Sequence, residues 1–344
     1  MTSEASKEFR RFSEPEAEEL ARRYFHLIGS ATVLNGEIDQ NFLISVDRGD
    51  KYVLKISPQN SDRNWLTCQA ELLDHLQSKQ LNIATPKPIR DINKNYVSEH
   101  VSGEHAFPLR MLAWIEGGLL DVVEHYDEQL LQNLGQSVAA VDMALRDFTH
   151  PATDRHLRWD TRNVMELESS LAAINNRERR KLAVDLLGLL PQKLLTQLKQ
   201  FPRFVIHNDG GNQHNMLVTK HDKKWRVNGI IDFGDAVLTH RVLGLGIACA
   251  YASFSAKSPK TAISFVTRGY MKVATLSRGE LAVVPWATIA RWLATVIVAA
   301  RRATSEPDNS YAQVSAEPAW SALETLIEHD IDGLGFELAE RNVT

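Results

Sequence analysis

The chain has 344 residues, of which 44% are apolar and 24% are charged, and its formal net charge is −4 with both signs interspersed. These values are those of a globular protein large enough for two modest domains or one two-lobed unit, and the lack of a basic stripe argues against nucleic acid as a ligand. Cys68 and Cys249 lie far apart in apolar-periodic segments, so we expect buried free thiols. With neither a signal-peptide core nor an apolar run of about 18 residues, we expect a cytoplasmic protein that does not cross a membrane.

The first third of the chain has the pattern of a small antiparallel sheet with helices. Ser13 can cap a helix in which Pro15 fits the first turn and Glu16 completes a capping box, and Gly29 is expected to end it. Two β-rich runs around "DRGD" then predict a hairpin. A helix and two more strands follow, over residues 63–80, 95–100 and 110–115.

The pattern changes at the glycine pair 117–118. Most of the chain beyond it is helical, and short strands return only around residues 204–235. We therefore predict an α+β, bilobal fold, with a small antiparallel-sheet lobe over residues 1–115 and a large, mostly helical lobe over residues 116–344. So few strands in the second part argue against a doubly wound parallel sheet.

The segment "FVIHNDGGNQHNMLV", residues 204–218, joins two apolar runs through nine polar or glycine residues. A hairpin turn takes about two to five residues, and surplus loop length in a compact domain is usually functional. Asp209 could accept the proton of a substrate hydroxyl, and His207 could hold the loop by hydrogen bonds. An ordinary turn around Asp209 is the alternative interpretation.

Asp232 and Lys55 extend this set toward phosphoryl transfer. Asp232 ends the apolar strand before "FGD", where a rigidly held carboxylate suits Mg²⁺ together with Asn215. Lys55 interrupts the apolar strand "YVLKIS" and requires an anion such as a phosphate, unless its side chain reaches solvent from an edge strand. Kinases typically have these features in this order: a strand lysine, a hinge, an Asp…Asn loop and an Asp-Phe-Gly segment. The weaker alternative is a zinc site formed by His207, His214 and His240. No nearby set of cysteines or carboxylates completes such a site.

These motifs resemble the aminoglycoside phosphotransferase and choline kinase group of protein-kinase-like small-molecule kinases. The His-x-Asp…Asn and "IDFG" patterns mark that superfamily. The segments "GEIDQNFLI" and "EPDNSYAQVSAEPAWSALETL" are more similar to hydroxylysine kinases and to the kinase-like domain fused to some class III aminotransferases. The resemblance covers nearly the whole chain and implies a bilobal protein-kinase-like fold that uses ATP or GTP with Mg²⁺.

The resemblance also implies a role for each candidate residue. Asp209 is the expected catalytic base, Asn215 and Asp232 are the expected Mg²⁺ ligands, and Lys55 is expected to contact the phosphates. A carboxylate that orients Lys55 should lie on the following helix, where Glu71 is our candidate. The nucleotide is further expected to contact the turn that includes Asp39, Gln40 and Asn41, and the hinge residues Trp114, Ile115 and Glu116.

Two departures from the family pattern concern the loop. One residue more than usual separates Asp209 from Asn215, and we expect Gly210 and Gly211 to absorb it in a bulge at positive φ. The alternative is a different register, in which His214 takes the place of the asparagine. Gly244 stands where the family has an aspartate that supports the loop. A loop held less firmly, with low activity, is therefore expected.

The late helical part should supply the contacts to the acceptor. Arg291 is our candidate for pairing the carboxylate of an amino acid, with a solvated helix arginine as the alternative. Scattered rather than clustered acids favour a zwitterionic hydroxylated acceptor over a polycationic aminoglycoside. Further candidates for the acceptor pocket are Asp235, Asn309 and Tyr311, although a helix cap is the alternative for Asn309.

The leading hypothesis is a Mg²⁺-dependent kinase that phosphorylates a hydroxyl of a small amine or amino acid, with hydroxylysine as the first candidate. A kinase for an aminoglycoside, choline, ethanolamine or homoserine is the alternative acceptor assignment. A weakly active, nucleotide-binding pseudokinase regulator is the alternative from another class. We infer no obligate protein partner.

Overall fold

The computed structural model describes residues 10–305 and 314–341 of the chain. The chain forms two compact units, unit 1 of Met1–Gln80 with Thr85–Glu116 and unit 2 of Leu81–Ala84 with Gly117–Thr344. The short segment 81–84 belongs to unit 2, since the N–H of Ala84 donates to the carbonyl oxygen of Asn228 at 2.8 Å.

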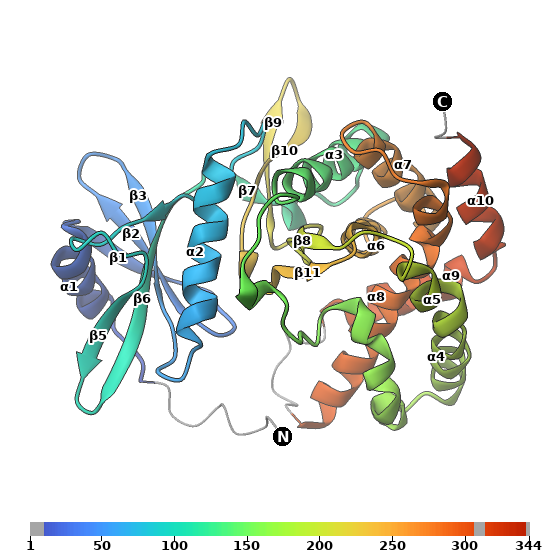
Figure 1. Ribbon diagram of the computed structural model, residues 1–344, viewed down its shortest axis with the longest axis horizontal. Helices are drawn as coiled ribbons and strands as arrows, with labels where there is room; N and C mark the ends of the chain where they lie inside the picture. Colours follow the sequence, from blue (N-terminus) through green and yellow to red (C-terminus); the bar gives the residue numbers. More distant parts are fainter. Residues whose placement is uncertain (1–9, 306–313, 342–344) are drawn as a thin grey trace. The chain divides into compact units, whose positions relative to one another are not determined.

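Unit 1 is built on an antiparallel sheet of strand order β1-β2-β3-β6-β4, with β5 paired to β6 (Figure 1). The strands are β1 (Gly29–Leu34), β2 (Gln40–Val46), β3 (Lys51–Ile56), β4 (Pro88–Ile89), β5 (Ser98–Ser102) and β6 (His105–Ala113). The predicted hairpin is confirmed as β2 and β3, which pair around a turn where Gly49 has a φ of 91°. β1 was not predicted, because "GSATVL" has few large apolar residues, and it forms an edge of the sheet.

Helix α1 (Glu14–Phe25) begins with the predicted capping box. The N–H of Glu16 donates to Ser13 Oγ at 3.4 Å, and the N–H of Ser13 donates to the Glu16 carboxylate at 2.8 Å. The prediction that Gly29 ends this helix is wrong, since His26 ends it in the left-handed conformation, with a φ of 54°. Gly29 instead begins β1, where a Cβ would lie 2.1 Å from a backbone oxygen of β2.

Helix α2 (Arg63–Gln77) and α1 lie on opposite sides of this sheet (Figure 1). Side chains of α1 pack with those of β2, β3 and β6 in one core, which includes Leu20, Phe42, Leu54 and Leu109. Because side chains alternate along a strand, Lys55 and Arg110 project from the other face, where Arg110 Nη1 donates to Gln69 Oε1 of α2 at 2.6 Å.

Unit 2 is mostly helical, as predicted. Its helices are α3 (Glu128–Ala144), α4 (Arg177–Leu190), α5 (Thr196–Leu198), α6 (Arg241–Ala252), α7 (Pro259–Met271), α8 (Arg278–Ser305), α9 (Ala316–Leu326) and α10 (Ile331–Arg341), with short helical turns η1 (Leu120–Val122), η2 (Pro151–Thr153), η3 (Thr161–Ala173), η4 (Pro191–Leu195) and η5 (Phe233–Asp235). α8 packs against α6, α9, α10 and η3, and its Trp292 is fully buried. Among the described residues, α8 is the one helix long and apolar enough to cross a membrane, but 89% of its most apolar window is buried within the protein.

Two small sheets complete unit 2. One has the order β10 (Lys224–Ile230), β9 (Met216–His221) and β7 (Gly118–Leu119), and the other pairs β11 (Val237–Thr239) with β8 (Phe204–Ile206). The apolar runs on either side of the loop at 207–215 are therefore β8 and β9, which belong to different sheets. The loop has its length because it passes from one sheet to the other.

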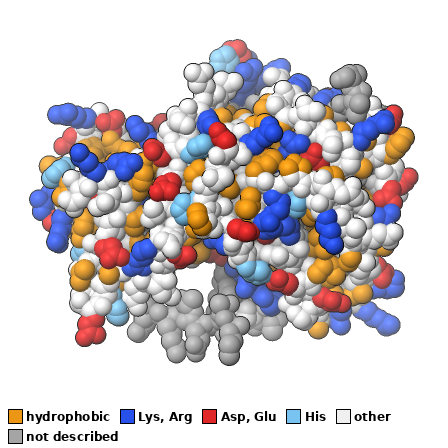
Figure 2. Space-filling view, viewed as in Figure 1, with side chains coloured by type: hydrophobic (Ala, Val, Ile, Leu, Met, Phe, Trp, Pro, Cys, Tyr) orange, Lys and Arg blue, Asp and Glu red, His pale blue; other side chains and the backbone are white. Residues whose placement is uncertain are grey.

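The placement of charged side chains and of the two cysteines agrees with what the sequence predicts. On the face drawn in Figure 2, Lys and Arg side chains are interspersed with Asp and Glu side chains. Neither Cys68 nor Cys249 forms a disulfide, and both are buried as predicted, because Cys68 lies among the buried residues of α2 and α6, which carries Cys249, is buried from Val242 to Ala252.

Candidate active site

The loop that follows β8 is anchored at its start by His207. Its Nε2 donates to the carbonyl oxygen of Ile231 at 2.9 Å, and its Nδ1 accepts from the N–H of Asp209 at 3.3 Å. The imidazole lies 4.3 Å from the ring of Phe233, centroid to centroid. Burial lowers the pKa of His207, so the ring is neutral, with one donor and one acceptor nitrogen. The histidine thus ties the loop to the Asp-Phe-Gly segment.

Asp209 is held by three side-chain donors from two parts of unit 2. Its Oδ1 accepts from Arg291 Nη2 of α8 at 2.7 Å, and its Oδ2 accepts from the amide nitrogens of Asn212 and Asn215, each at 2.9 Å. Burial raises the pKa of Asp209 to about 6, although Arg291 and the two amides oppose the rise. The carboxylate is therefore fixed in position, which is what orienting a substrate hydroxyl requires.

The two glycines of the loop do not absorb its extra residue at positive φ, contrary to expectation. The described loop residue with positive φ is Asn208, at 63°. Gly211 serves a different purpose, because a Cβ there would lie 2.2 Å from the Cα of Ala248 in α6. Glycine is needed here so that the loop backbone can pack directly on the helix.

Gly211→Ala is expected to destabilise the protein by about 3 kcal/mol, because backbone atoms of α6 would have to move. Gly188→Ala is the matched control, since an added Cβ at Gly188 in α4 would meet no atom within 4 Å among the described residues beyond its chain neighbours and its own helix backbone. That variant should gain about 0.5–1 kcal/mol from helix propensity. Urea unfolding of both variants measures the difference, and equal stabilities would contradict the close approach of loop and helix.

Asp232 and Asn215 can supply oxygen ligands to a metal ion. Asp232 follows β10 with a φ of 61° and is exposed, and its Oδ1 accepts from the N–H of Gly234 at 3.3 Å. The N–H of Ile231 donates to the carbonyl oxygen of Asn215 at 2.8 Å, so the two segments lie side by side. The described residues contain no group of three His, Cys, Asp or Glu that could hold a metal ion. These donors suit Mg²⁺, which takes few protein ligands and completes its shell with water and phosphates.

A third acidic side chain, Asp235 of η5, lies near the other two. Burial and the neighbouring Asp209 together raise the pKa of Asp235 to about 6, although Arg291 opposes the rise. Arg155 fixes this turn, with its Nη2 donating to the carbonyl oxygen of Gly234 at 2.6 Å. Carboxylates that raise one another's pKa are typical of sites that bind a cation.

The position of Gly244 faces a carboxylate from another helix. A Cβ at Gly244 would lie 3.6 Å from Asp142 Oδ2 of α3 and 3.0 Å from Ile206. Asp142 is 1% exposed, and its Oδ2 accepts from the hydroxyl of Tyr270 in α7 at 2.8 Å. A buried carboxylate therefore lies beside the glycine, although it bonds to α7.

In unit 1, Lys55 forms an ion pair with Asp39, with 3.4 Å between Nζ and Oδ2. Arg110, which is opposite Lys55 on the neighbouring strand, donates to the same oxygen at 2.7 Å. Burial raises the pKa of Asp39, but Arg110 and Lys55 outweigh it and hold the pKa below its usual range. The carboxylate keeps two like charges together, which would otherwise repel across the strands.

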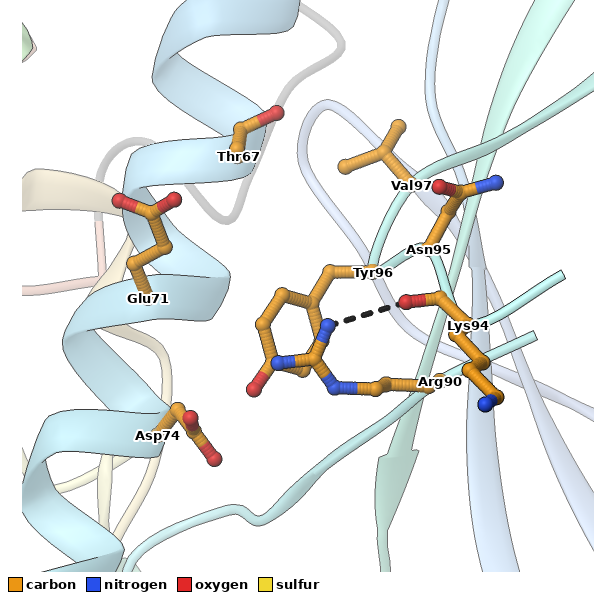
Figure 3. A pocket seen from close by; sticks show the side chains of 8 residues that line it. All are labelled: Thr67, Glu71, Asp74, Arg90, Lys94, Asn95, Tyr96 and Val97. Carbon is orange, nitrogen blue, oxygen red and sulfur yellow. Dashed lines mark hydrogen bonds between the residues drawn. The ribbon is translucent and has the colours of Figure 1, made fainter.

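Asp39 is thus a carboxylate paired with Lys55, whereas Glu71 was the residue expected in this role. Asp39 immediately precedes β2, whose Asn41 is the direct cross-strand neighbour of Lys55. Glu71 lies on α2 with Thr67 and Asp74 at a groove of about 400 Å³, across from Arg90 and Tyr96 (Figure 3). The role expected for Glu71 stays a prediction, while the turn before β2 supplies a carboxylate to Lys55 that the sequence analysis did not assign to this role.

The remaining predicted nucleotide contacts also lie in unit 1. The side chain of Gln40 accepts from the N–H of Phe12 at 2.8 Å and donates to the carbonyl oxygen of Arg10 at 2.6 Å, so it fixes the segment before α1. Asn41 Nδ2 donates to the carbonyl oxygen of Asn35 at 3.0 Å and closes the turn.

The hinge residues Trp114, Ile115 and Glu116 follow β6. The N–H of Trp114 donates to the carbonyl oxygen of Lys51 at 3.0 Å, and the Glu116 carboxylate accepts from Lys51 Nζ at 2.9 Å. The hinge is therefore fixed to the start of β3.

Some of the residues at the site differ from those predicted. Asn309 and Tyr311 lie outside the described residues. Asn212, Tyr251 and Trp159 were not predicted, yet Asn212 bonds to Asp209, and the two aromatic rings lie 5.3 and 4.9 Å from the guanidinium carbon of Arg291. Their sequence positions carry no motif that would have identified them.

Comparison with known proteins assigns the chain to a family. The family model described as the phosphotransferase enzyme family (APH) matches residues 30–277. Hydroxylysine kinase of Mus musculus is 25% identical over 96% of this chain and 94% of its own length. Hydroxylysine kinase of Xenopus laevis is 26% identical over 89% of this chain and 87% of its own length.

Solved structures share the fold at lower identity. A microcompartment-associated aminopropanol kinase has a TM-score of 0.69 and 17% identity, covering 92% of this chain and 98% of its own. An amicoumacin kinase in complex with AMP-PNP, Ca²⁺ and Ami also has a TM-score of 0.69, with 16% identity over 93% of this chain and 95% of its own. The predicted α+β, protein-kinase-like fold is therefore confirmed. The chain belongs to the phosphotransferase enzyme family and is a small-molecule kinase that acts on hydroxyl groups.

Proposed function

We propose that the protein transfers the γ-phosphoryl group of ATP or GTP, with Mg²⁺, to a hydroxyl of a small amine or amino acid, with a hydroxylysine-like compound as the first candidate. The observation that carries the proposal is the fixed carboxylate of Asp209, bonded by Arg291, Asn212 and Asn215 next to the exposed Asp232. Relatives that match nearly the full chain are hydroxylysine kinases. We expect the enzyme in the cytoplasm.

Asp209 acts as the base in this proposal. It accepts a hydrogen bond from the acceptor hydroxyl and takes its proton as the oxygen bonds to the γ-phosphorus and the bond to the β-phosphate oxygen breaks. Because the transition state of phosphoryl transfer is loose, positioning the hydroxyl matters more than strong basicity. His207 and Asn212 keep the carboxylate and its loop in place.

The nucleotide is bound by Lys55, the hinge residues 114–116 and the metal ligands. Lys55 contacts the phosphates, and Asp39 orients its ammonium group by the ion pair at 3.4 Å. Asp232 and Asn215 hold Mg²⁺, which neutralises phosphate charge when it is bound.

The direct test is release of nucleoside diphosphate, measured by a coupled assay with ATP and with GTP. The acceptors are hydroxylysine, homoserine, choline, ethanolamine and kanamycin. Turnover with hydroxylysine supports the proposal, whereas preferred turnover with kanamycin or choline assigns a different acceptor. Protection of the protein by nucleotide against thermal unfolding, with no turnover on any acceptor, would instead select a pseudokinase regulator.

Asp232→Asn should raise the Mg²⁺ concentration needed for half-maximal nucleotide binding by at least about tenfold, because an anionic ligand is lost. Titration of Mg²⁺ at fixed nucleotide, followed by calorimetry, measures the shift. Asp185→Asn is the control, since Asp185 is an exposed partner of Lys181 on α4. An unchanged Mg²⁺ requirement in Asp232→Asn would remove this residue from the metal site.

A further inference from the structure

Arg291 has more hydrogen-bonding capacity than the protein uses. It lies in the middle of α8 and is 3% exposed. Its Nη2 donates to Asp209 at 2.7 Å and to the Tyr251 hydroxyl at 2.9 Å. Its Nε and Nη1 are buried without a hydrogen-bond partner among the described residues. Buried charged donors are rarely left unpaired, so these two nitrogens indicate a missing acceptor group.

The surroundings hold the guanidinium in one orientation. The indole of Trp159 and the ring of Tyr251 lie 4.9 and 5.3 Å from its central carbon. Such contacts stabilise the cation and favour a fixed plane. Trp159 is half-buried and comes from the segment between η2 and η3, so this side of the guanidinium is bounded by a residue that reaches the surface.

The chemistry of the missing group follows from charge and position. The two nitrogens are charged donors that an ammonium group cannot satisfy, whereas a carboxylate can accept charge-assisted hydrogen bonds from both, even though Asp209 already offsets the guanidinium charge. Because Nη2 of the same guanidinium bonds to the proposed base, a carboxylate on the other nitrogens would lie at a fixed, short offset from the hydroxyl that Asp209 orients.

We propose that Arg291 binds the carboxylate of the acceptor and thereby restricts this kinase to hydroxylated amino acids, excluding the corresponding amino alcohols. This inference rests on the proposed function. It makes Arg291 a residue that determines specificity and positions the acceptor, in addition to its ion pair with Asp209. The competing interpretation is that Arg291 only balances the buried charge of Asp209.

Matched pairs of acceptors separate the two interpretations. Hydroxylysine is compared with its decarboxylated diamine, and homoserine with 3-aminopropan-1-ol, so that each pair differs by the carboxylate alone. In the pair that the wild type phosphorylates better, kcat/KM for the amino acid should exceed that for the amino alcohol by about 10–100-fold, mainly through KM. This is the effect expected of one charged hydrogen-bonding contact. In Arg291→Gln the ratio within the pair should fall to near one, and Arg291→Lys should restore part of it.

The ratio within a pair is informative even if Arg291→Gln lowers overall activity. Equal losses for acid and amino alcohol would overturn the inference and leave Arg291 as a partner of Asp209 only. A wild-type preference for the amino alcohols would overturn it too, while the proposed kinase function would stand. Arg278→Gln, at the exposed start of the same helix, is the control and should keep the wild-type ratio.

Binding without turnover provides a separate readout. If no acceptor is phosphorylated, the proposed function fails, and calorimetry with the same pairs still tests Arg291. Binding of the acids that depends on Arg291 would support the inference. Equal binding of acid and amino alcohol, or no binding of either, would overturn it.

Discussion

Asp209→Asn is expected to lower turnover by about 10²–10⁴-fold while nucleotide binding persists. Asparagine keeps the shape of the side chain, but it cannot take the proton of the acceptor hydroxyl. It also lacks the charge that pairs with Arg291 at 2.7 Å, so some loss of stability should accompany the kinetic effect. Steady-state release of nucleoside diphosphate and calorimetric titration of nucleotide measure the two properties separately.

Asp222→Asn is the matched control for this substitution. Asp222 lies in the turn between β9 and β10, and its side chain is 91% exposed. Circular dichroism at the assay temperature should show that Asp209→Asn remains folded. Full turnover in a folded Asp209→Asn protein would show that this residue is not the base.

Asp142→Asn is expected to remove a pH dependence of the free energy of unfolding. Burial raises the pKa of Asp142 to about 7 in the folded protein, against 3.8 for the unperturbed side chain, although the Tyr270 hydrogen bond and Arg241 oppose the rise. The folded state therefore keeps a proton that the unfolded chain releases. The free energy of unfolding falls as pH rises from about 4 to about 7, and the loss is complete above the folded pKa.

The size of the expected change in the free energy of unfolding depends on how much of this pH interval the experiment covers. Between pH 5 and pH 8 the wild type should lose about 2–3 kcal/mol through this group. Asparagine has no such proton, and its amide oxygen can still accept from Tyr270. The variant should therefore be the more stable protein at pH 8, with a smaller advantage at pH 5.

Urea unfolding at several pH values between 5 and 8 tests this expectation. Asp185→Asn serves again as an exposed control, because its side chain is 56% exposed and pairs with Lys181 on the surface of α4. Its stability curve should run parallel to that of the wild type. A parallel curve for Asp142→Asn as well would show that the buried carboxyl does not carry the proton.

Local patterns in the sequence predicted those elements whose causes are local. The capping box at Ser13 and the hairpin of β2 and β3 depend on residues that are close together in the sequence. Both are present in the structure. The predicted end of α1 is wrong. Gly29 does not end the helix; a glycine is needed there because the backbone of β1 lies close to that of β2. A contact between strands distant in sequence leaves no signal in a local pattern.

The candidate residues themselves could be predicted from local patterns, but their hydrogen-bond and ion-pair partners could not. The sequence singled out Lys55, Asp209 and Asp232, since charged residues at the ends or in the middle of apolar strands stand out. It did not predict that Asp39 would pair with Lys55, or that Asn212 would bond to Asp209. Several side chains in each region could make such bonds, and only the three-dimensional path of the chain selects one.

The amino-acid sequence by itself determined the class of fold, the order of the motifs and the kinase chemistry that they indicate, because these depend on residue types and their spacing along the chain. The tertiary structure decided that Arg291, 82 positions from Asp209, forms an ion pair with it and has two further nitrogens without a hydrogen-bond partner in the described part of the chain. Packing of α8 against α6 and η3 fixes that distance, and packing between distant segments is not encoded in any short stretch of residues.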